Sequence, residues 1–460
     1  RVQLRVGRAW LGISAPALLV MSFLLLIAVG TAGLLLIPGL QSGPPLRFLD
    51  ALFTITSAVC VTGLAVVDTA THFTRLGQLW LLLFIQLGGL GLLALTTLVI
   101  GSLGGRLSLR SEMMVGAPVD FEDRRPVVTL ALAIVRYTVV AEGLGAIALF
   151  LLWLPRFDLA DAAWHAVFQA ISAFCNAGFA TFSDSLEGFA QSPFSLLVLA
   201  ALVVSGGLGF LSTEEFVRWW RERRHRRVRL SIHTWAAFTV TAALLLAGFA
   251  AYLFSEWDGA LAGLPPAHRV SNALFMSVTA RTAGFNTVPY ALLTNSGVLF
   301  TILLMLVGGS PGSTAGGLKT TTLAVLVSLA WARFSGRRHT VLHGRTVPAG
   351  TVQRTVSVVL LVTAILLAAV FVLGILESRH LPLEQSRQAF LPLVFEVVSA
   401  FCTVGLSMGM TADLSAAGRL LAILLMFIGR VGPLVFFAAI SIERSSANEV
   451  REAAEDLVVG

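Results

Sequence analysis

The sequence predicts an all-α integral membrane protein with eight transmembrane helices and four re-entrant pore loops. These form four helix–pore-loop–helix repeats around a pseudo-fourfold axis. Three observations predict this fold. Only 12% of the 460 residues are charged and 56% are hydrophobic, so the chain cannot cover itself with a solvated surface. Apolar runs long enough to cross ~30 Å of hydrocarbon occur eight times, and one loop motif recurs four times between them.

The eight apolar runs cover residues 16–38, 75–100, 127–153, 194–215, 232–256, 297–334, 354–376 and 417–442, the sixth being interrupted. No small-residue cleavage site follows the first run, so we expect no signal peptide. We expect one membrane domain over residues 1–460. Its repeats are 16–100, 127–215, 232–334 and 354–442, and a cytoplasmic tail follows at 443–460.

The positive charges indicate the orientation. Segments 1–15, 101–126, 216–231, 333–354 and 443–460 hold 21 of the 32 Lys and Arg residues, and the segments on the opposite side hold 8. The positive-inside rule therefore predicts that both termini are cytoplasmic. The basic run 218–229 needs no nucleic-acid partner, because a cytoplasmic turn between two spans explains it.

The repeated motif runs from a phenylalanine to a glycine and covers residues 53–63, 168–178, 275–284 and 395–405. The cysteines Cys60, Cys175 and Cys402 each stand three residues before the aligned glycine, and Arg281 takes that place in the third copy. We expect these cysteines to be small buried residues, the alternative being a three-cysteine metal site. A second glycine cluster follows in each repeat, at 88–91, 206–209, 308–309 and 429–432. The unit is therefore span, re-entrant segment, span.

Four such units can close around one axis. A short pore helix such as 49–59 would direct its partly negative C-terminal end towards that axis and favour a cation there. Backbone carbonyls of the returning chain would replace the hydration shell of K⁺, and glycine permits the backbone angles that align them. The predicted selectivity-filter residues are Val61, Thr62, Gly63, Asn176, Ala177, Gly178, Thr282, Ala283, Gly284, Thr403, Val404 and Gly405. Asp68, Asp184 and Asp413 follow these glycines and either concentrate cations at the outer mouth or are solvated loop charges.

The sixth run contains five glycines and Pro311 within residues 308–317, which no helix interior would carry. We expect a loop there, just below the filter, the alternative being a packing kink. Residues 312–320 are one residue too long for a Walker A motif and follow a helix instead of a strand. Lys319 and Arg430 are intramembrane cations and hence functional candidates. We expect Arg430 to face the ion path and contact this loop; the alternative is an ion pair of Arg430 or Arg281 with Glu396.

The four loops, together with residues 308–322, resemble the Trk/Ktr/HKT superfamily of potassium transporters, and most closely its KtrB-type membrane subunits, over residues 10–445. The resemblance implies a potassium-conducting subunit in which the sixth-span loop is a gate. The gate residues are then Gly308, Gly309, Gly312, Ser313, Thr314, Gly316, Gly317, Lys319 and Arg430. Gly63 implies potassium, since plant relatives selective for sodium carry a serine there.

The resemblance also implies partners and location. It implies a homodimer in the bacterial inner membrane, regulated by a cytoplasmic KtrA-type ring that binds ATP or ADP. Such a ring would dock on the basic segments 101–126, 216–231 and 333–354. The transported ion is K⁺, Na⁺ is an expected activator, and no organic cofactor is expected in this chain.

Other function classes fit less well. A cation-coupled secondary transporter, such as a Na⁺/K⁺ symporter, would show inverted repeats, whereas all four repeats here share one orientation. A Na⁺-permeable relative of the family remains an alternative. An enzyme would need catalytic side chains at membrane depth, but the eight histidines lie near span ends or in loops. We therefore expect no enzymatic activity.

Overall fold

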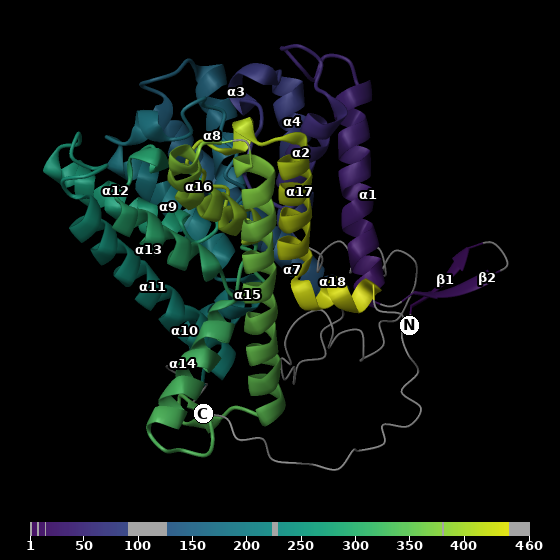
Figure 1. The fold of residues 1–460 in the computed structure, drawn as a ribbon, viewed down its shortest axis with the longest axis vertical. Coiled ribbons are helices and arrows are strands. Elements are labelled where there is room, and N and C mark those ends of the chain that lie inside the picture. The colour runs from purple at the N-terminus through teal and green to yellow at the C-terminus, as the bar shows by residue number, and fades with distance from the viewer. Residues whose placement is uncertain are drawn as a thin grey trace.

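The computed structural model describes residues 2–6, 9–13, 15–90, 127–222, 229–379 and 381–440. Most of them are helical (Figure 1). Its strands are β1 (Val2–Val6), β2 (Ala9–Ile13), β3 (Val341–Leu342) and β4 (Arg345–Thr346), which pair as two antiparallel hairpins. Its α-helices are α1 (Ala15–Leu36), α2 (Phe48–Val59), α3 (Thr69–His72), α4 (Arg75–Gly89), α7 (Val127–Trp153), α8 (Leu159–Cys175), α9 (Pro193–Gly207), α10 (Phe210–Glu222), α11 (Ile232–Glu256), α12 (Pro266–Thr279), α13 (Asn295–Leu306), α14 (Thr320–Phe334), α15 (Ala349–Ser378), α16 (Leu383–Phe401), α17 (Ala416–Val431) and α18 (Pro433–Ile440). Short 3₁₀ helices cover Glu187–Phe189, Tyr290–Leu292 and Thr411–Asp413.

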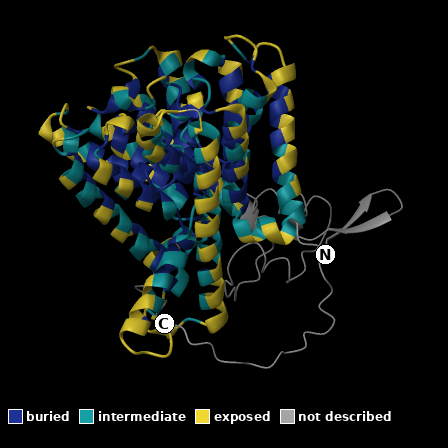
Figure 2. Ribbon diagram, in the orientation of Figure 1, coloured by how far each residue is buried: buried dark blue, intermediate teal, exposed yellow. Residues whose placement is uncertain are grey.

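Four helices of the described residues, within α1, α7, α11 and α15, are each long and apolar enough to cross a membrane. Their outer faces carry exposed apolar side chains, as Leu360, Leu367 and Phe371 of α15 illustrate with 66 to 70% of their surface accessible. Figure 2 shows this exposed layer around a buried centre. An apolar surface of this extent suits contact with lipid hydrocarbon and not with water.

The helices that follow the predicted pore helices are broken in three repeats. α9 and α10 meet at 100°, and α17 and α18 meet at 98°. The apolar runs 194–215 and 417–442 therefore each hold a bent pair of helices, with the bend at the second glycine cluster. Gly209 and Gly432 have φ values of +82° and +92°, which end a helix, and Pro433 suits the start of the next one. The interruption expected in 297–334 is present, between α13 and α14; beyond residue 90, the run 75–100 lies outside the described residues.

The centre of the protein is formed by four shorter helices, α2, α8, α12 and α16, one from each repeat. The first residue of the repeated motif is a phenylalanine in each of them, and all four rings are at most 1% exposed: Phe53, Phe168, Phe275 and Phe395. The motif therefore begins with a core residue in every copy.

The four units pack in a cyclic order. Each second helix contacts the central helix of the next unit: α4 packs on α8, α9 on α12, α13 on α16, and α17 returns to α2. Such packing closes the four repeats into a ring, as the expected pseudo-fourfold arrangement requires. It brings the four loops that follow the central helices together.

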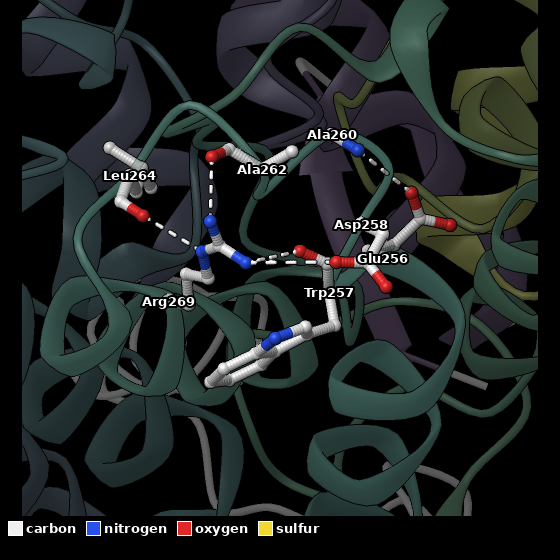
Figure 3. Close-up of polar contacts among 7 residues, drawn as sticks. All are labelled: Glu256, Trp257, Asp258, Ala260, Ala262, Leu264 and Arg269. Carbon is white, nitrogen blue, oxygen red and sulfur yellow. Dashed lines mark hydrogen bonds and ion pairs between the residues drawn. The ribbon is translucent and has the colours of Figure 1, made fainter.

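The turn between α11 and α12 is held by a dense polar network (Figure 3). The Arg269 guanidinium donates hydrogen bonds of 2.7 to 2.8 Å to the carbonyls of Trp257, Ala262 and Leu264. The buried Glu256 carboxylate accepts from the backbone nitrogen of Ala260 at 3.2 Å, and also from the N-cap residue of α13. Since the backbone groups of this turn are satisfied by side chains, it is a fixed support for the central helix that follows.

Candidate ion-conduction site

In each repeat the chain leaves the central helix through the same short turn. The residue before the aligned glycine donates its N–H to the carbonyl of a Ser or Thr in the last turns of the helix. These bonds join Thr62 to Ser57 (2.8 Å), Ala177 to Ser172 (2.8 Å), Ala283 to Thr279 (3.0 Å) and Val404 to Ser399 (2.9 Å). The four loops therefore start from one common geometry, although the third motif is one residue shorter.

The backbone of the four loops alternates in the same way. Each loop has positive φ at the aligned glycine and also two residues before it: Val61 (55°) and Gly63 (94°), Asn176 (60°) and Gly178 (70°), Thr282 (70°) and Gly284 (80°), Thr403 (50°) and Gly405 (92°). Positive φ is unfavourable for residues other than glycine, and most of all for β-branched ones. Strain repeated at four equivalent places is typical of a functional site.

The four aligned glycines close into a ring, which we call the glycine ring: Gly63, Gly178, Gly284 and Gly405. Each glycine faces the carbonyl oxygen of the residue before the next glycine, so that Gly63 faces Ala177, Gly178 faces Ala283, Gly284 faces Val404 and Gly405 faces Thr62. A Cβ atom added to Gly63 would lie 2.6 Å from the Ala177 oxygen, closer than real side chains come. At Gly178 the corresponding distance to the Ala283 oxygen is 3.1 Å, so a side chain at any of the four positions would force the neighbouring backbone to shift.

A hydroxyl group braces each loop from behind. Ser57 and Ser399 accept from the backbone N–H of Gly63 and Gly405 at 3.0 and 3.1 Å. Ser172 and Thr279 donate to the carbonyls of Phe179 and Phe285, both at 2.7 Å. The sequence aligns these four hydroxyls in one column, but we assigned them no role from the sequence. A Ser or Thr conserved in type across all four motif copies was the signal that could have identified them.

The second glycine cluster lets the neighbouring helices approach the central ones. A Cβ atom at Gly88, Gly206 or Gly429 would collide with the last-turn carbonyl of the central helix of its own repeat. The cysteines Cys60, Cys175 and Cys402 are buried and unpaired. Within the described ranges there is no group of three or more His, Cys, Asp or Glu side chains that could hold a metal ion.

The loop of residues 307–319 lies against the fourth repeat's ring-forming loop. A Cβ atom on Gly316 would lie 2.6 Å from the Cys402 carbonyl oxygen and would overlap the Thr403 hydroxyl. Within the 307–319 loop, Gly308 donates to the Leu318 carbonyl at 3.0 Å, which closes the base of the loop. The loop therefore lies next to Thr403, one of the predicted filter residues, as expected.

Hydrogen bonds tie the 307–319 loop to the second repeat. The backbone N–H groups of Ser310 and Thr314 donate to the carbonyls of Gly207 (2.9 Å) and Gly206 (3.2 Å). The Thr314 hydroxyl donates to the Phe174 carbonyl at 3.2 Å. Gly309 packs against Gly207, and the buried Ser313 hydroxyl has no hydrogen-bond partner among the described residues. Gly312 has a φ of +72° with open space around it, and Gly317 a φ of +63°.

Three cationic side chains complete the contacts of the 307–319 loop. Arg430 donates to the Thr314 carbonyl and, at 2.5 Å, to the Gly88 carbonyl of the first repeat. Arg281 donates to the Gly308 carbonyl at 2.7 Å, and Lys319 Nζ donates to the Ala315 carbonyl at 2.8 Å. All three cations therefore bind backbone carbonyls.

The alternative ion pair of Arg430 or Arg281 with Glu396 is wrong. Glu396 accepts hydrogen bonds from the hydroxyls of Ser407 and Thr411 instead. Both arginines are occupied by carbonyls of the 307–319 loop, as described above. Every residue has a backbone carbonyl, so the sequence does not show which carbonyls an arginine binds. An acidic side chain is visible in the sequence, and this is why Glu396 was considered as the partner.

Acidic side chains lie in the segments that follow the loops. Asp68 accepts from the Ser183 hydroxyl at 2.5 Å, which links the first and second repeats. Asp184 accepts from the Gly188 N–H at 3.0 Å, and Glu187 accepts from the Asn286 amide at 2.7 Å. Burial, and to a lesser extent the neighbouring Asp184, raises the pKa of Glu187 above its usual value.

The chain is similar to known cation transport proteins over nearly its whole length. A family model described as TrkH, cation transport protein, matches residues 11–451. The chain is 36% identical over 439 residues to the potassium/sodium uptake protein NtpJ of Enterococcus hirae, covering 95% of each. It is 38% identical over 421 residues to the Ktr system potassium uptake protein B of Vibrio alginolyticus, covering 91% of this chain and 90% of that one.

A solved structure supports the fold. The potassium transporter TrkH of Vibrio parahaemolyticus superposes with a TM-score of 0.69, covering 92% of this chain and 83% of that one, at 17% sequence identity. At this identity the likeness concerns the fold alone. The family model and the relatives above 30% identity carry the assignment: the chain belongs to the TrkH/Ktr family of cation transport proteins.

Proposed function

We propose that this protein is the ion-conducting subunit of a potassium uptake system, and that K⁺ passes through the glycine ring. The observation that carries this proposal is the closed cycle of four glycines, each against the carbonyl of the next loop. The names of the relatives, which describe potassium or potassium/sodium uptake, support the same ion.

The ring has the chemistry that a cation filter needs. Positive φ at two alternating residues per loop turns successive carbonyls, and those carbonyls would replace the hydration shell of a K⁺ ion. The four central helices end at the ring, and their C-terminal dipole ends favour a positive charge there. With a single glycine per loop, we expect a filter with fewer sites than a potassium channel and with less strict selectivity.

We infer a topology of eight crossings with four re-entrant loops. The first helix of each repeat crosses alone, and the central helix with its loop enters halfway and returns. The remaining crossings are the second helices, broken or bent in the second, third and fourth repeats. The distribution of Lys and Arg supports cytoplasmic termini, and the family supports the bacterial inner membrane as the location and a homodimer as the assembly.

We assign the 307–319 loop as the gate. Its contact with Cys402 and Thr403 would obstruct the path on one side of the ring, and Arg430 would add an electrostatic barrier to cations. Hydrogen bonds hold it, worth about 1 kcal/mol each between neutral groups and about 1.5 to 3 kcal/mol each where Arg281 or Arg430 donates, so a regulator that replaced these bonds could displace it. A cytoplasmic nucleotide-binding ring is the regulator that the Ktr names support, with Na⁺ as an activator, and the basic segments would dock it.

Complementation tests the proposal. A bacterium that lacks its own potassium uptake should grow at low K⁺ when it expresses this chain with a KtrA-type partner, and less well without the partner. The matched control is the Gly374→Ala variant, since Gly374 of α15 has open space around it and should rescue growth fully. No rescue under any condition, with the protein present in the membrane, would contradict the proposal.

A Na⁺-permeable transporter is the second candidate, favoured by the potassium/sodium name of the E. hirae relative. It predicts that Na⁺ crosses at a rate comparable with K⁺. Uptake of ²²Na⁺ by the same cells would separate the two candidates, because a potassium filter should admit little of it. A Na⁺/K⁺ symporter would instead show K⁺ uptake that stops without external Na⁺.

A further inference from the structure

One buried acid of the central helices has no place in the function proposed above. The residue after the aligned phenylalanine is Thr54, Gln169, Met276 or Glu396 in the four repeats. All four are at most 1% exposed, but only the fourth is a carboxylate. A carboxylate this deeply buried is costly unless its oxygens are satisfied or its charge is balanced.

The Glu396 carboxylate binds the chain segment that leaves the glycine ring. Its Oε2 accepts from the Ser407 hydroxyl at 2.8 Å, and its Oε1 accepts from the Thr411 hydroxyl. The Ser407 hydroxyl in turn accepts from the Gly409 N–H at 3.0 Å. Residues 406–411, the outer limb of the fourth loop, are therefore fastened to α16 directly beyond Gly405.

Within the part of the chain that the structure describes, the other three loops have no such strap. Ala65, Ala180 and Asn286 stand where the fourth repeat has Ser407. Neither amide atom of Gln169 has a hydrogen-bond partner among the described residues, and the Thr54 hydroxyl donates back to the Asp50 carbonyl of its own helix.

Those three loops are instead linked to one another. Asp68 and Ser183 join the segments after the first and second glycines at 2.5 Å. Asn286 and Glu187 join those after the third and second at 2.7 Å, with a further backbone bond from Leu186 to Asn286 at 3.0 Å. Among the hydrogen bonds of the described residues, the fourth limb has no link of this kind, and Glu396 supplies its anchor.

We propose that Glu396 is a positioning residue for ion selection. By fastening the outer limb of the fourth loop to α16, it fixes the position of the Gly405 carbonyl oxygen along the axis of the glycine ring. This inference rests on the proposed function of the ring as a potassium filter. A loose fourth carbonyl would let the ring contract around a smaller cation, so the strap favours K⁺ over Na⁺.

The experiment uses the purified full chain in liposomes and measures ⁸⁶Rb⁺ uptake with K⁺ or Na⁺ as competitor. Two variants break the strap from opposite sides: Glu396→Gln removes the carboxylate, and Ser407→Ala with Thr411→Val removes both hydroxyl donors but keeps the carboxylate. The matched control is Gln169→Met, which changes the equivalent residue of the second repeat to the one found in the third. Membrane levels and thermal melting identify any variant that fails to fold.

Both strap variants should lose about tenfold in the preference for K⁺ over Na⁺, the size expected for a lost hydrogen bond to a buried charge. Their maximal rate should stay within about twofold of the parent, and Gln169→Met should keep the parent's preference. If Glu396→Gln does not fold, the single variant Ser407→Ala tests the proposal instead. In that variant Glu396 still accepts a hydrogen bond from the Thr411 hydroxyl.

Unchanged selectivity in the strap variants would overturn the proposal. A loss of K⁺ preference in Glu396→Gln alone would also overturn it, because the effect would then come from the charge and not from the position of the limb. An equal loss of K⁺ preference in Gln169→Met would overturn it as well. A parent protein that itself does not prefer K⁺ would contradict the proposed function of the ring, a result distinct from failure of the strap.

Discussion

The glycine ring and the 307–319 loop touch each other, yet they are held in different ways. All four repeats build the ring from the same backbone turn, the same positive φ values and the same column of hydroxyls. Among the described residues, a loop of this length interrupts the second helix in the third repeat alone. Backbone carbonyls of the second repeat and Arg430 of the fourth repeat hold it, and Arg430 also binds Gly88 of the first repeat.

The difference separates selection from gating. Steric crowding fixes the ring, because a Cβ atom at any of its glycines would press on the carbonyl of the next loop. The loop is fixed by hydrogen bonds, worth about 1 kcal/mol each between neutral groups and about 1.5 to 3 kcal/mol each where an arginine donates, and such bonds can be exchanged for others. A symmetric, sterically fixed element suits the discrimination of ions, and an asymmetric, weakly held one suits movement.

The largest effect should come from adding a side chain to the ring. Gly405→Ala would force a Cβ atom into the Thr62 carbonyl at a φ of +92°, so growth at low K⁺ should be abolished. Gly39→Ala is the matched control, because Gly39 has a similar φ of +84° but open space around it and lies outside the four loops. Equal growth of cells carrying Gly405→Ala and parent protein would show that the ring does not need its glycines.

Removal of the arginine that bridges the loop and the first repeat should have the next largest effect. Arg430→Ala breaks the bonds to Thr314 and Gly88 and removes a half-buried positive charge. Partner-independent ⁸⁶Rb⁺ flux should rise by at least roughly tenfold, because one lost charge-assisted hydrogen bond alone is worth about 1.5 to 3 kcal/mol and about 1.4 kcal/mol corresponds to tenfold. Arg430→Lys keeps the positive charge but cannot donate to both carbonyls from one planar group. Its flux should lie between those of the parent and of Arg430→Ala. Flux and partner dependence that match the parent would refute the barrier.

A smaller effect should follow from pushing the loop away from the ring. Gly316→Ala would place a methyl group against the Cys402 carbonyl and the Thr403 hydroxyl, so partner-independent flux should rise by about threefold to tenfold. Gly312→Ala adds the same methyl group in the same loop where no atom lies within 4 Å, and it should change the flux less. The assignment of the loop as a gate would fail if Gly312→Ala had the larger effect.

The smallest effect concerns the only lysine of the chain. Lys319 closes the end of the loop through its bond to Ala315, and Lys319→Arg keeps the charge while changing the length and shape of the donor. We expect a twofold to threefold change, about 0.5 kcal/mol, in the partner concentration that gives half-maximal uptake. Arg387→Lys, a reciprocal change at an exposed position of α16 outside the basic segments, should leave that concentration unaltered.

Much of this arrangement could be predicted from the sequence because close packing of backbone segments requires particular residue types. Glycine is needed where backbone approaches backbone, and the cysteine three residues earlier gave the register. The interruption between α13 and α14 was visible because Pro311 and five glycines crowd into ten residues. These features depend on residue type, which a sequence displays directly.

The features that could not be predicted depend on backbone groups and common side chains, which no particular residue type marks in a sequence. The bends of 100° and 98° near Gly209 and Gly432 lie inside apolar runs, where a glycine cluster indicates flexible backbone but not the size of a bend. Arg430 and Arg281 bind backbone carbonyls, which every residue carries. The Glu396 strap binds two hydroxyls of a loop, and Ser and Thr in a loop are too common to single out. Only the folded chain reveals such pairings.

Ion competition in liposomes tests the central claim most directly. The purified chain should take up ⁸⁶Rb⁺, and K⁺ should compete with it at least about tenfold more effectively than Na⁺. Gly405→Ala should remove this difference, while Gly39→Ala should retain it. Equal competition by Na⁺ and K⁺ in the parent protein, or full K⁺ preference in Gly405→Ala, would contradict the assignment of the glycine ring as the potassium filter.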